Sequence, residues 1–147
     1  MPDTNPRAQP LPSDVVQYRL PGGWTVLAGK TDDANEYLSL TLARPKDLWF
    51  HIHGMSGSHV LLRAREGTAP DRATIACAAG IAAYHSTARS AGTGSVSCTE
   101  ARHVAKPRGA KRGTVTIKQE KMLKVRPMTA KALAPLRRAP GEDEDAE

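Results

Sequence analysis

The sequence is poor in several residue types, and each shortage excludes a class of protein. It has two cysteines in 147 residues, Cys77 and Cys98, which are too few for a disulfide scaffold and are not spaced as a CxxC motif. No apolar run approaches the roughly 20 residues that span a bilayer, and the N-terminus lacks the apolar segment of a secretory signal. We therefore expect a cytoplasmic protein with two small buried thiols.

Acidic residues are scarce outside the C-terminal end. The formal net charge is +6, although the last seven residues, GEDEDAE, hold five acids and no base. Between Arg102 and Arg126 there are nine lysines and arginines and one acid, Glu120. Such a one-sided segment is typical of proteins that bind a polyanion, and nucleic acid is the most common one. A merely solvated basic surface is the alternative.

Short strand patterns and turns follow one another along most of the chain. VVQYRL and WTVLAG flank a Pro-Gly-Gly turn, which predicts a hairpin. Residues 35–42, NEYLSLTL, could form a strand or a short helix, because their periodicity fits both. The remaining predicted strands are DLWFHI, HVLLR, SVSCTE, RHVA, GTVTIK and MLKV.

A single alanine-rich helix is predicted in the middle of the chain. Thr68 and Asp71 have capping-box spacing, and the body RATIACAAGIAAYHSTARSAG extends to Gly92, a suitable C-terminal residue. Gly80 is unfavourable inside a helix, so it predicts close contact with another backbone. The fold class is therefore α+β, with mainly antiparallel strands packed around one long alanine-rich helix.

The composition divides the chain into three parts. Residues 15–127 are predicted to form the domain, and residues 1–14 a disordered, proline-rich leader. Residues 128–147 are predicted to be a disordered tail, first basic and then acidic, whose first part could add a short basic helix.

The stretch DLWFHIHGMSGSHV, residues 47–60, holds a tryptophan and three histidines. Successive side chains of a strand point to opposite faces, so Leu48, Phe50 and Ile52 should lie on the core face. A turn at 54–58 would bring the next strand alongside. The side chains predicted to share the outward face are Trp49, His51, His53, His59 and Arg63.

Three kinds of site fit these histidines: a metal site, a hydrolase site and a nucleic-acid-binding surface. A metal site could use all three, but no acid occurs between Asp47 and Glu66 to complete it. An RNA-processing hydrolase could use His51 and His59 as acid and base. A serine nucleophile is disfavoured, because Ser-Gly-Ser lacks the second glycine of a nucleophile elbow.

The third kind of site, a nucleic-acid-binding surface, uses more of the chain than the other two. Trp49 would stack on a base or brace the strand, and the loop KPRGAKRG, residues 106–113, would contact a phosphate backbone. RNA and DNA remain open as partners on this reasoning alone. No catalytic residue, metal ligand or cofactor is predicted. The predicted contact set is Trp49, His51, His53, Ser58, His59, Arg63, Lys106, Arg108, Lys111 and Arg112.

Four motifs resemble those of the NFACT-R domain family. DLWFHIHGMSGSHVLL is similar to the family's Asp-Leu-Trp-Phe-His strand and Pro-Gly-Ser-His-Val turn. AAGIAAYHSTARSAG resembles its AA-x-x-AAYYSKAR helix, and ARHVAKPRGAKRGTVTI its basic strand and Lys-Pro-x-Gly-Ala-Lys-Pro-Gly loop. GGWTVLAGKTDDANEYLSL resembles its opening. The resemblance spans residues 15–125. Departures are Ser56 and Arg112 in place of prolines, and His53 where relatives often carry Lys or Arg.

The resemblance implies a non-catalytic RNA-binding module, with tRNA or rRNA as the partner. In large relatives this module accompanies other domains, and those proteins bind the obstructed large ribosomal subunit in ribosome quality control. This chain is too short to hold those other parts, so we expect a stand-alone module. The oligomeric state does not follow from the sequence.

Overall fold

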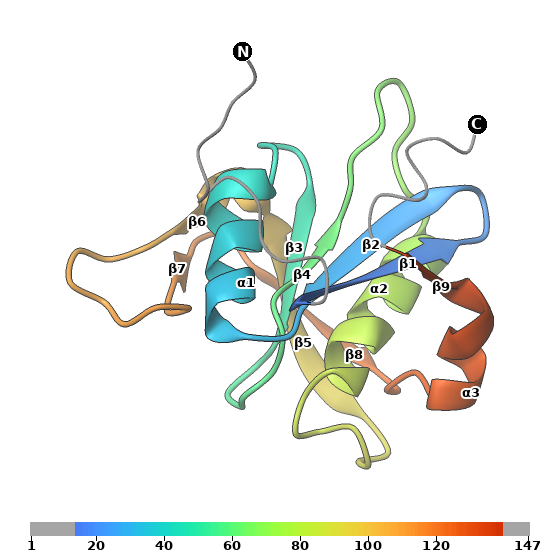
Figure 1. Cartoon of the computed structure of the whole chain (residues 1–147). Helices are drawn as coiled ribbons and strands as arrows, with labels where there is room; N and C mark the ends of the chain where they lie inside the picture. Colours follow the sequence, from blue (N-terminus) through green and yellow to red (C-terminus); the bar gives the residue numbers. More distant parts are fainter. Residues whose placement is uncertain (1–13, 140–147) are drawn as a thin grey trace.

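The structure is a computed structural model that describes residues 14–139 (Figure 1). The predicted leader, except Asp14, and the acidic end of the predicted tail lie outside the described residues. Seven strands form one antiparallel sheet in the order β8-β5-β3-β4-β2-β1-β9, and β6 pairs with β7 in a separate ribbon. The strands are β1 (Val15–Leu20), β2 (Trp24–Gly29), β3 (Leu48–Ile52), β4 (Val60–Leu62), β5 (Gly94–Glu100), β6 (Val104–Ala105), β7 (Thr116–Ile117), β8 (Lys121–Val125) and β9 (Arg137–Arg138).

The first two strands form the predicted hairpin. β1 and β2 pair antiparallel, with Leu20 opposite Trp24 across the Pro-Gly-Gly turn. Gly22 and Gly23 both have positive φ, at 92° and 85°, a backbone conformation that residues with a side chain rarely adopt. The predicted pairing of the DLWFHI strand with the strand after its turn is also confirmed, since β3 and β4 are antiparallel neighbours.

The ambiguous residues 35–42 are helical. Helix α1 (Asp32–Glu36) continues without a break into a π-helical segment, Tyr37–Leu42. Two other α-helices are α2 (Arg72–Tyr84) and α3 (Ala130–Leu133), and short 3₁₀ turns occupy Ala101–His103 and Ala134–Leu136. The domain is thus mixed α/β with a large antiparallel sheet and short helices. Within residues 14–139 there is no single long helix of the kind that the sequence predicted.

Helix α2 is shorter than predicted at both ends. Asp71, not Thr68, is its N-cap, because the Asp71 Oδ1 accepts a hydrogen bond from the Thr74 N–H at 2.8 Å. The helix ends at Tyr84, because His85 leaves the helical conformation with ψ at 41° and the chain beyond it bonds to another segment, the His85 carbonyl accepting from the Ser58 N–H at 2.8 Å. The predicted continuation to Gly92 is wrong for this reason.

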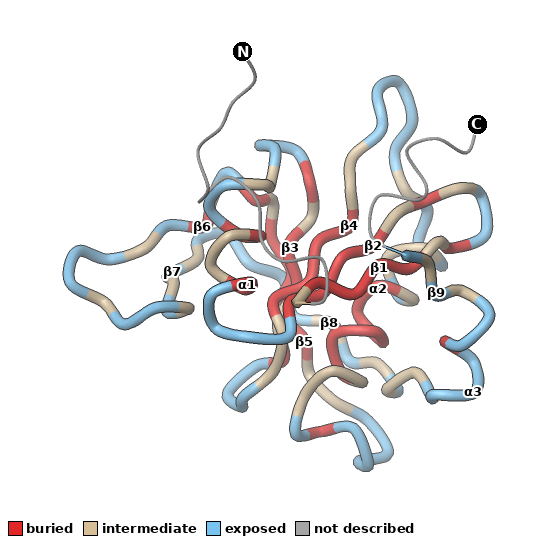
Figure 2. Tube along the Cα trace, viewed as in Figure 1, coloured by how far each residue is buried: buried red, intermediate tan, exposed pale blue. Residues whose placement is uncertain are grey.

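The central strands of the sheet are buried on both faces, whereas the edge strands β8 and β9 are partly exposed (Figures 1 and 2). On one face α2 and α3 cover a core that contains Phe50 and Ile52. On the other face the helical segment 32–42 covers a second, smaller core that contains Leu38 and Trp49. Antiparallel sheets often leave one face to solvent, but the centre of this one is covered on both faces.

The boundary predicted at residue 127 is too early. Leu133 of α3 is 3% exposed and belongs to the larger core, and β9 pairs with β1 at the far edge of the sheet. Residues 128–138 are therefore part of the fold, including the short helix that the sequence allowed.

The thiols are free. Cys98 is buried on β5 as predicted, and burial raises its pKa to about 11, so it stays protonated. Cys77 on α2 is partly buried, and burial raises its pKa as well.

Gly80 lies where another segment crosses helix α2, as predicted. The Met128 N–H donates to the Gly80 carbonyl at 3.0 Å. A Cβ at position 80 would lie 3.0 Å from Met128 Cγ and 3.1 Å from the Arg126 carbonyl oxygen. The absent side chain thus lets the chain pass from the sheet edge at β8 to helix α3.

We predict that Gly80→Val lowers the free energy of unfolding by about 3 kcal/mol, because its methyl groups would push the 126–128 segment away from the helix. Ala76→Val on the exposed side of α2 is the matched control and should cost roughly 0.5 kcal/mol through helix propensity alone. Urea denaturation measures both values. Equal losses would show that the close contact at Gly80 has no energetic role.

Candidate nucleic-acid interface

A buried hydrogen-bond network joins the helical segment 32–42 to the sheet. The Trp49 indole N–H donates to Ser39 Oγ at 2.8 Å, and Ser39 Oγ lies 2.7 Å from His59 Nδ1. An indole N–H can only donate, so Ser39 Oγ accepts from Trp49, and the same hydroxyl group also hydrogen-bonds the His59 Nδ1 atom.

Burial keeps the histidines of this network neutral. His59 is 5% exposed, and burial lowers its pKa to about 4, with a further lowering by nearby His51. His51 stacks against Trp49 with ring centroids 5.9 Å apart, and burial lowers its pKa too. An acid–base pair that works near neutral pH would need at least one of them to titrate there.

The predicted outward face of β3 is mostly covered. The sequence pattern split the side chains of β3 correctly, but the helical segment 32–42 covers the side that was predicted to be open. Trp49 is 3% exposed, so its indole braces the second core, one of the two roles predicted for it, and does not stack on a ligand here. His51 is half-buried, and His53, which lies in the turn directly after β3, is exposed.

Arg63 also serves the fold. Its Nη1 lies 3.1 Å from the Asp47 carboxylate and donates to the Leu42 carbonyl. Asp47 is fully buried and also accepts from the Ala64 N–H at 2.7 Å. The predicted contact of Arg63 with phosphate would compete with this ion pair, which holds the end of the π-helical segment against β4.

The basic loop, residues 106–113, is fixed at both ends by one carboxylate. Lys106 Nζ lies 3.1 Å from Glu36 Oε1, and the Gly113 N–H donates to the same oxygen at 2.9 Å. These bonds, the one from Gly113 first, lower the pKa of Glu36. Arg112 pairs with Asp33 at 3.0 Å.

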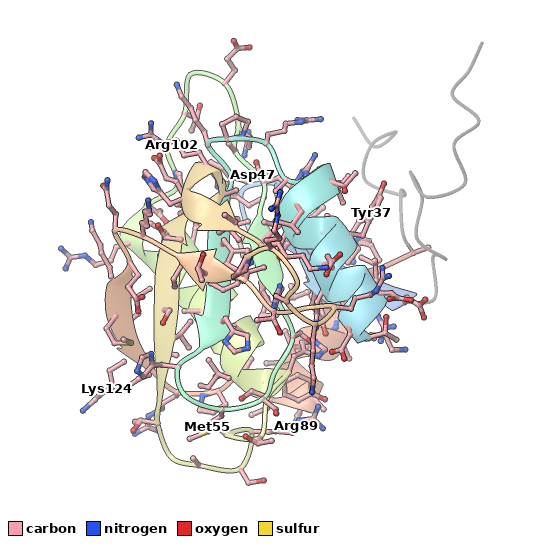
Figure 3. All side chains as sticks on the ribbon, turned by 90° about the vertical axis from the view of Figure 1, so that its left-hand side faces the viewer. Tyr37, Asp47, Met55, Arg89, Arg102 and Lys124 are labelled. Carbon is pink, nitrogen blue, oxygen red and sulfur yellow. The ribbon has the colours of Figure 1, made fainter. Side chains whose placement is uncertain are left out.

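Two cations remain at the tip of the basic loop. Arg108 and Lys111 are exposed, and neither has an ion-pair partner within residues 14–139. Figure 3 views this side of the molecule, where the orange loop extends toward helix α1. Among the predicted loop contacts, Arg108 and Lys111 could therefore bind a ligand without first breaking an ion pair within the described residues.

An open pocket of about 300 Å³ lies beside the root of this loop, which we call the loop pocket. On one side its wall is polar: Ser97 donates to Glu120 Oε2 at 3.0 Å, and His53 Nδ1 lies 3.4 Å from the same hydroxyl. The residues that line it are Trp49, His51, Ile52, His53, Gly54, His59, Ser97, Gly113, Thr114, Val115, Ile117 and Glu120.

Ser58 does not join this pocket but lines a second hollow of about 330 Å³. Here the Ser58 N–H donates to the His85 carbonyl at 2.8 Å, and the Thr87 N–H to the Ser56 carbonyl at 3.1 Å. Lys30 lies on its rim.

Lys30, Ser86 and Thr87, which line this second hollow, were not among the predicted contact residues. Three of the quoted family motifs meet there, namely Gly-Lys, Ser-Gly-Ser-His and His-Ser-Thr-Ala-Arg. Those motifs were the available signal, but no sequence rule placed them next to one another.

Within residues 14–139 no three His, Cys, Asp or Glu side chains are grouped as metal ligands would be. None of the helices there is long and apolar enough to cross a bilayer.

The fold and the site define a small mixed α/β domain in which the basic loop is held at both ends beside an open pocket. The sequence model of the NFACT protein RNA binding domain matches residues 15–119, and the chain belongs to this family. A solved structure, the C-terminal part of the fibronectin/fibrinogen-binding protein from Streptococcus suis, has the same fold. Its TM-score is 0.77 at 32% sequence identity, covering 84% of this chain and 49% of that one.

Curated relatives are much longer than this chain. Rqc2 homolog RqcH of Bacillus subtilis (strain 168) is 43% identical over 110 residues, 75% of this chain and 19% of the relative. Rqc2 homolog RqcH of Streptococcus suis (strain 05ZYH33) is 36% identical over 106 residues, 72% of this chain and again 19% of the relative. The chain therefore spans about a fifth of the length of these relatives.

We predict that acidification destabilises the protein through His59. Its folded pKa of about 4 lies below the ordinary 6.5, so below pH 6.5 the unfolded chain binds the proton first. The unfolding free energy should fall between pH 6.5 and pH 4, by about 2 kcal/mol at pH 5 for this residue.

Urea denaturation at pH 7.5 and pH 5 measures this loss, and His59→Gln should reduce it. His53→Gln, which changes an exposed histidine, is the matched control and should retain the loss of the unaltered protein. The same pH dependence in all three proteins would contradict a neutral, buried His59.

Proposed function

We propose that this chain binds structured RNA, tRNA or rRNA, as a non-catalytic module. The observation that carries the proposal is the basic loop: its two ends are held by Glu36, and its tip presents Arg108 and Lys111 with no ion-pair partner among the described residues. Membership of a family described as RNA-binding supports the same function.

Anchoring at both ends makes the loop suitable for a phosphate backbone. Only the short tip between the Lys106 and Gly113 contacts has to be ordered when a ligand binds, which limits the entropy lost. Lys106 and Arg112 add positive potential but are partly neutralised by Glu36 and Asp33. We therefore assign the largest phosphate contribution to the tip cations.

The contact surface extends from the loop to the two hollows. His53 at the loop pocket and Ser58 at the second hollow belong to the predicted contact set and remain in the proposed surface. Lys30 joins them, because its exposed ammonium group lies on the rim of a hollow lined by hydroxyl groups. Trp49, His59 and Arg63 support this surface from beneath.

We infer that the RNA partner belongs to the ribosome or is bound on it. This rests on the similarity to proteins named Rqc2 homolog RqcH and on the family resemblance. Sedimentation of the purified protein with large ribosomal subunits, with and without peptidyl-tRNA, would test it. Binding to free tRNA with no cosedimentation would point to a role away from the ribosome.

The alternative, an RNA-processing hydrolase, would use His51 and His59. The neutral state of both rings and the commitment of His59 Nδ1 to Ser39 disfavour it. Cleavage of RNA by the purified protein that stops in His51→Ala would support the hydrolase instead. Near-stoichiometric metal found by elemental analysis would support a metal-binding protein.

We predict that the double variant Arg108→Ala, Lys111→Ala weakens binding of tRNA and rRNA fragments without lowering stability. Each lost phosphate contact should reduce the slope of log affinity against log salt by about 1, because fewer counterions are released on binding. The loss should be similar for different RNA sequences, since phosphates carry no sequence information. Fluorescence anisotropy across a salt series measures both quantities.

A matched control removes the same number of charges from the opposite side of the sheet. Arg72→Ala with Lys131→Ala changes exposed cations on α2 and α3. Its salt slope should stay close to that of the unaltered protein. Equal weakening by the two double variants would show that overall charge, and not the loop, determines affinity. A DNA duplex in the same assay separates RNA from DNA binding.

A further inference from the structure

The loop pocket has the wrong charge for a phosphate. Glu120 is the one acid between Arg102 and Arg126, and it lines this pocket. No lysine or arginine is among the residues that line it. A carboxylate here would repel a phosphate group, although cations for phosphates lie on the loop next to it.

The size and the other walls of the loop pocket suit a planar ring. About 300 Å³ is at the small end of the range of ligand sites, which runs from about 300 to 1,000 Å³. Val115 and Ile117 supply apolar surface, and the neutral His51 ring is backed by the Trp49 indole. Imidazole and aliphatic side chains of this kind can hold an unstacked base.

The carboxylate is held in place with acceptor capacity left over. The Ser97 hydroxyl donates to Glu120 Oε2 at 3.0 Å, which orients the side chain from the floor of the sheet. A carboxylate has about four lone-pair positions, so Glu120 can accept further hydrogen bonds from a ligand. It has no ion-pair partner in residues 14–139.

We propose that the loop pocket receives one unstacked base of the bound RNA, and that Glu120 selects guanine there. The N1–H and N2–H groups of guanine point in the same direction and match the two oxygens of a carboxylate. Adenine and cytosine offer one amino group each on this edge, and uracil offers one N–H. The inference rests on the proposed RNA binding and adds to it a choice of base.

The test uses RNA hairpins that are identical except for one unpaired loop residue, which is G, A, C or U in an otherwise uridine loop. Fluorescence anisotropy at one salt concentration should give about tenfold tighter binding of the guanine hairpin than of the uracil hairpin. Glu120→Gln should lose most of this preference. Its affinity for the uracil hairpin should be equal or higher, because a negative charge near the RNA has been removed.

Glu100→Gln is the matched control, since it removes the same charge from an exposed carboxylate that lines a different hollow. It should retain the guanine preference. Equal affinity for all four hairpins, or a preference that persists in Glu120→Gln, would overturn the pocket assignment and leave RNA binding intact. Absence of salt-dependent binding to every hairpin and to tRNA would overturn the proposed function itself.

Discussion

The position of the basic loop depends on one buried hydroxyl group. Ser39 satisfies both the indole N–H of Trp49 and the ring nitrogen of His59 in the buried interior. Either group would cost about 1–3 kcal/mol if it were buried without a partner. The same bonds fasten the helical segment 32–42 to the sheet, and Glu36 on that segment holds the loop. A neutral, internal network therefore determines where the surface cations are presented.

Local signals in the sequence were sufficient for the hairpin and for the strands before residue 127, because turn residues and alternation act over a few neighbours, but β9 was missed. They were insufficient for the second face of the sheet. Alternation separated Phe50 from Trp49 correctly, but it contains no information on what covers each side. The covering segment, 35–42, was itself ambiguous between strand and helix. The end of α2 was missed because it depends on bonds between residues 85–87 and the distant residues 56–58, and not on composition.

The candidate site was predictable to the extent that it is local. The cations of the basic loop stand out in the sequence, whereas their partners do not, since Glu36 is 70 residues from Lys106. Arg63 looked like a phosphate ligand for the same reason, because its buried partner Asp47 lies on another segment. Both hollows are formed by segments that meet only in the folded chain. Motif matching could identify those segments but could not show that they line the same hollow.

The edge position of β8 has a consequence for contacts between copies of the protein. The outer side of this strand has no neighbour in the described sheet, so its backbone could pair with an identical strand. Lys121 and Lys124 are exposed on it, with Met122 47% exposed between them. Antiparallel pairing of two such edges would bring four ammonium groups together. Repulsion between these lysines thus opposes pairing of the unpaired β8 edge with a second copy, and this repulsion weakens as the salt concentration rises.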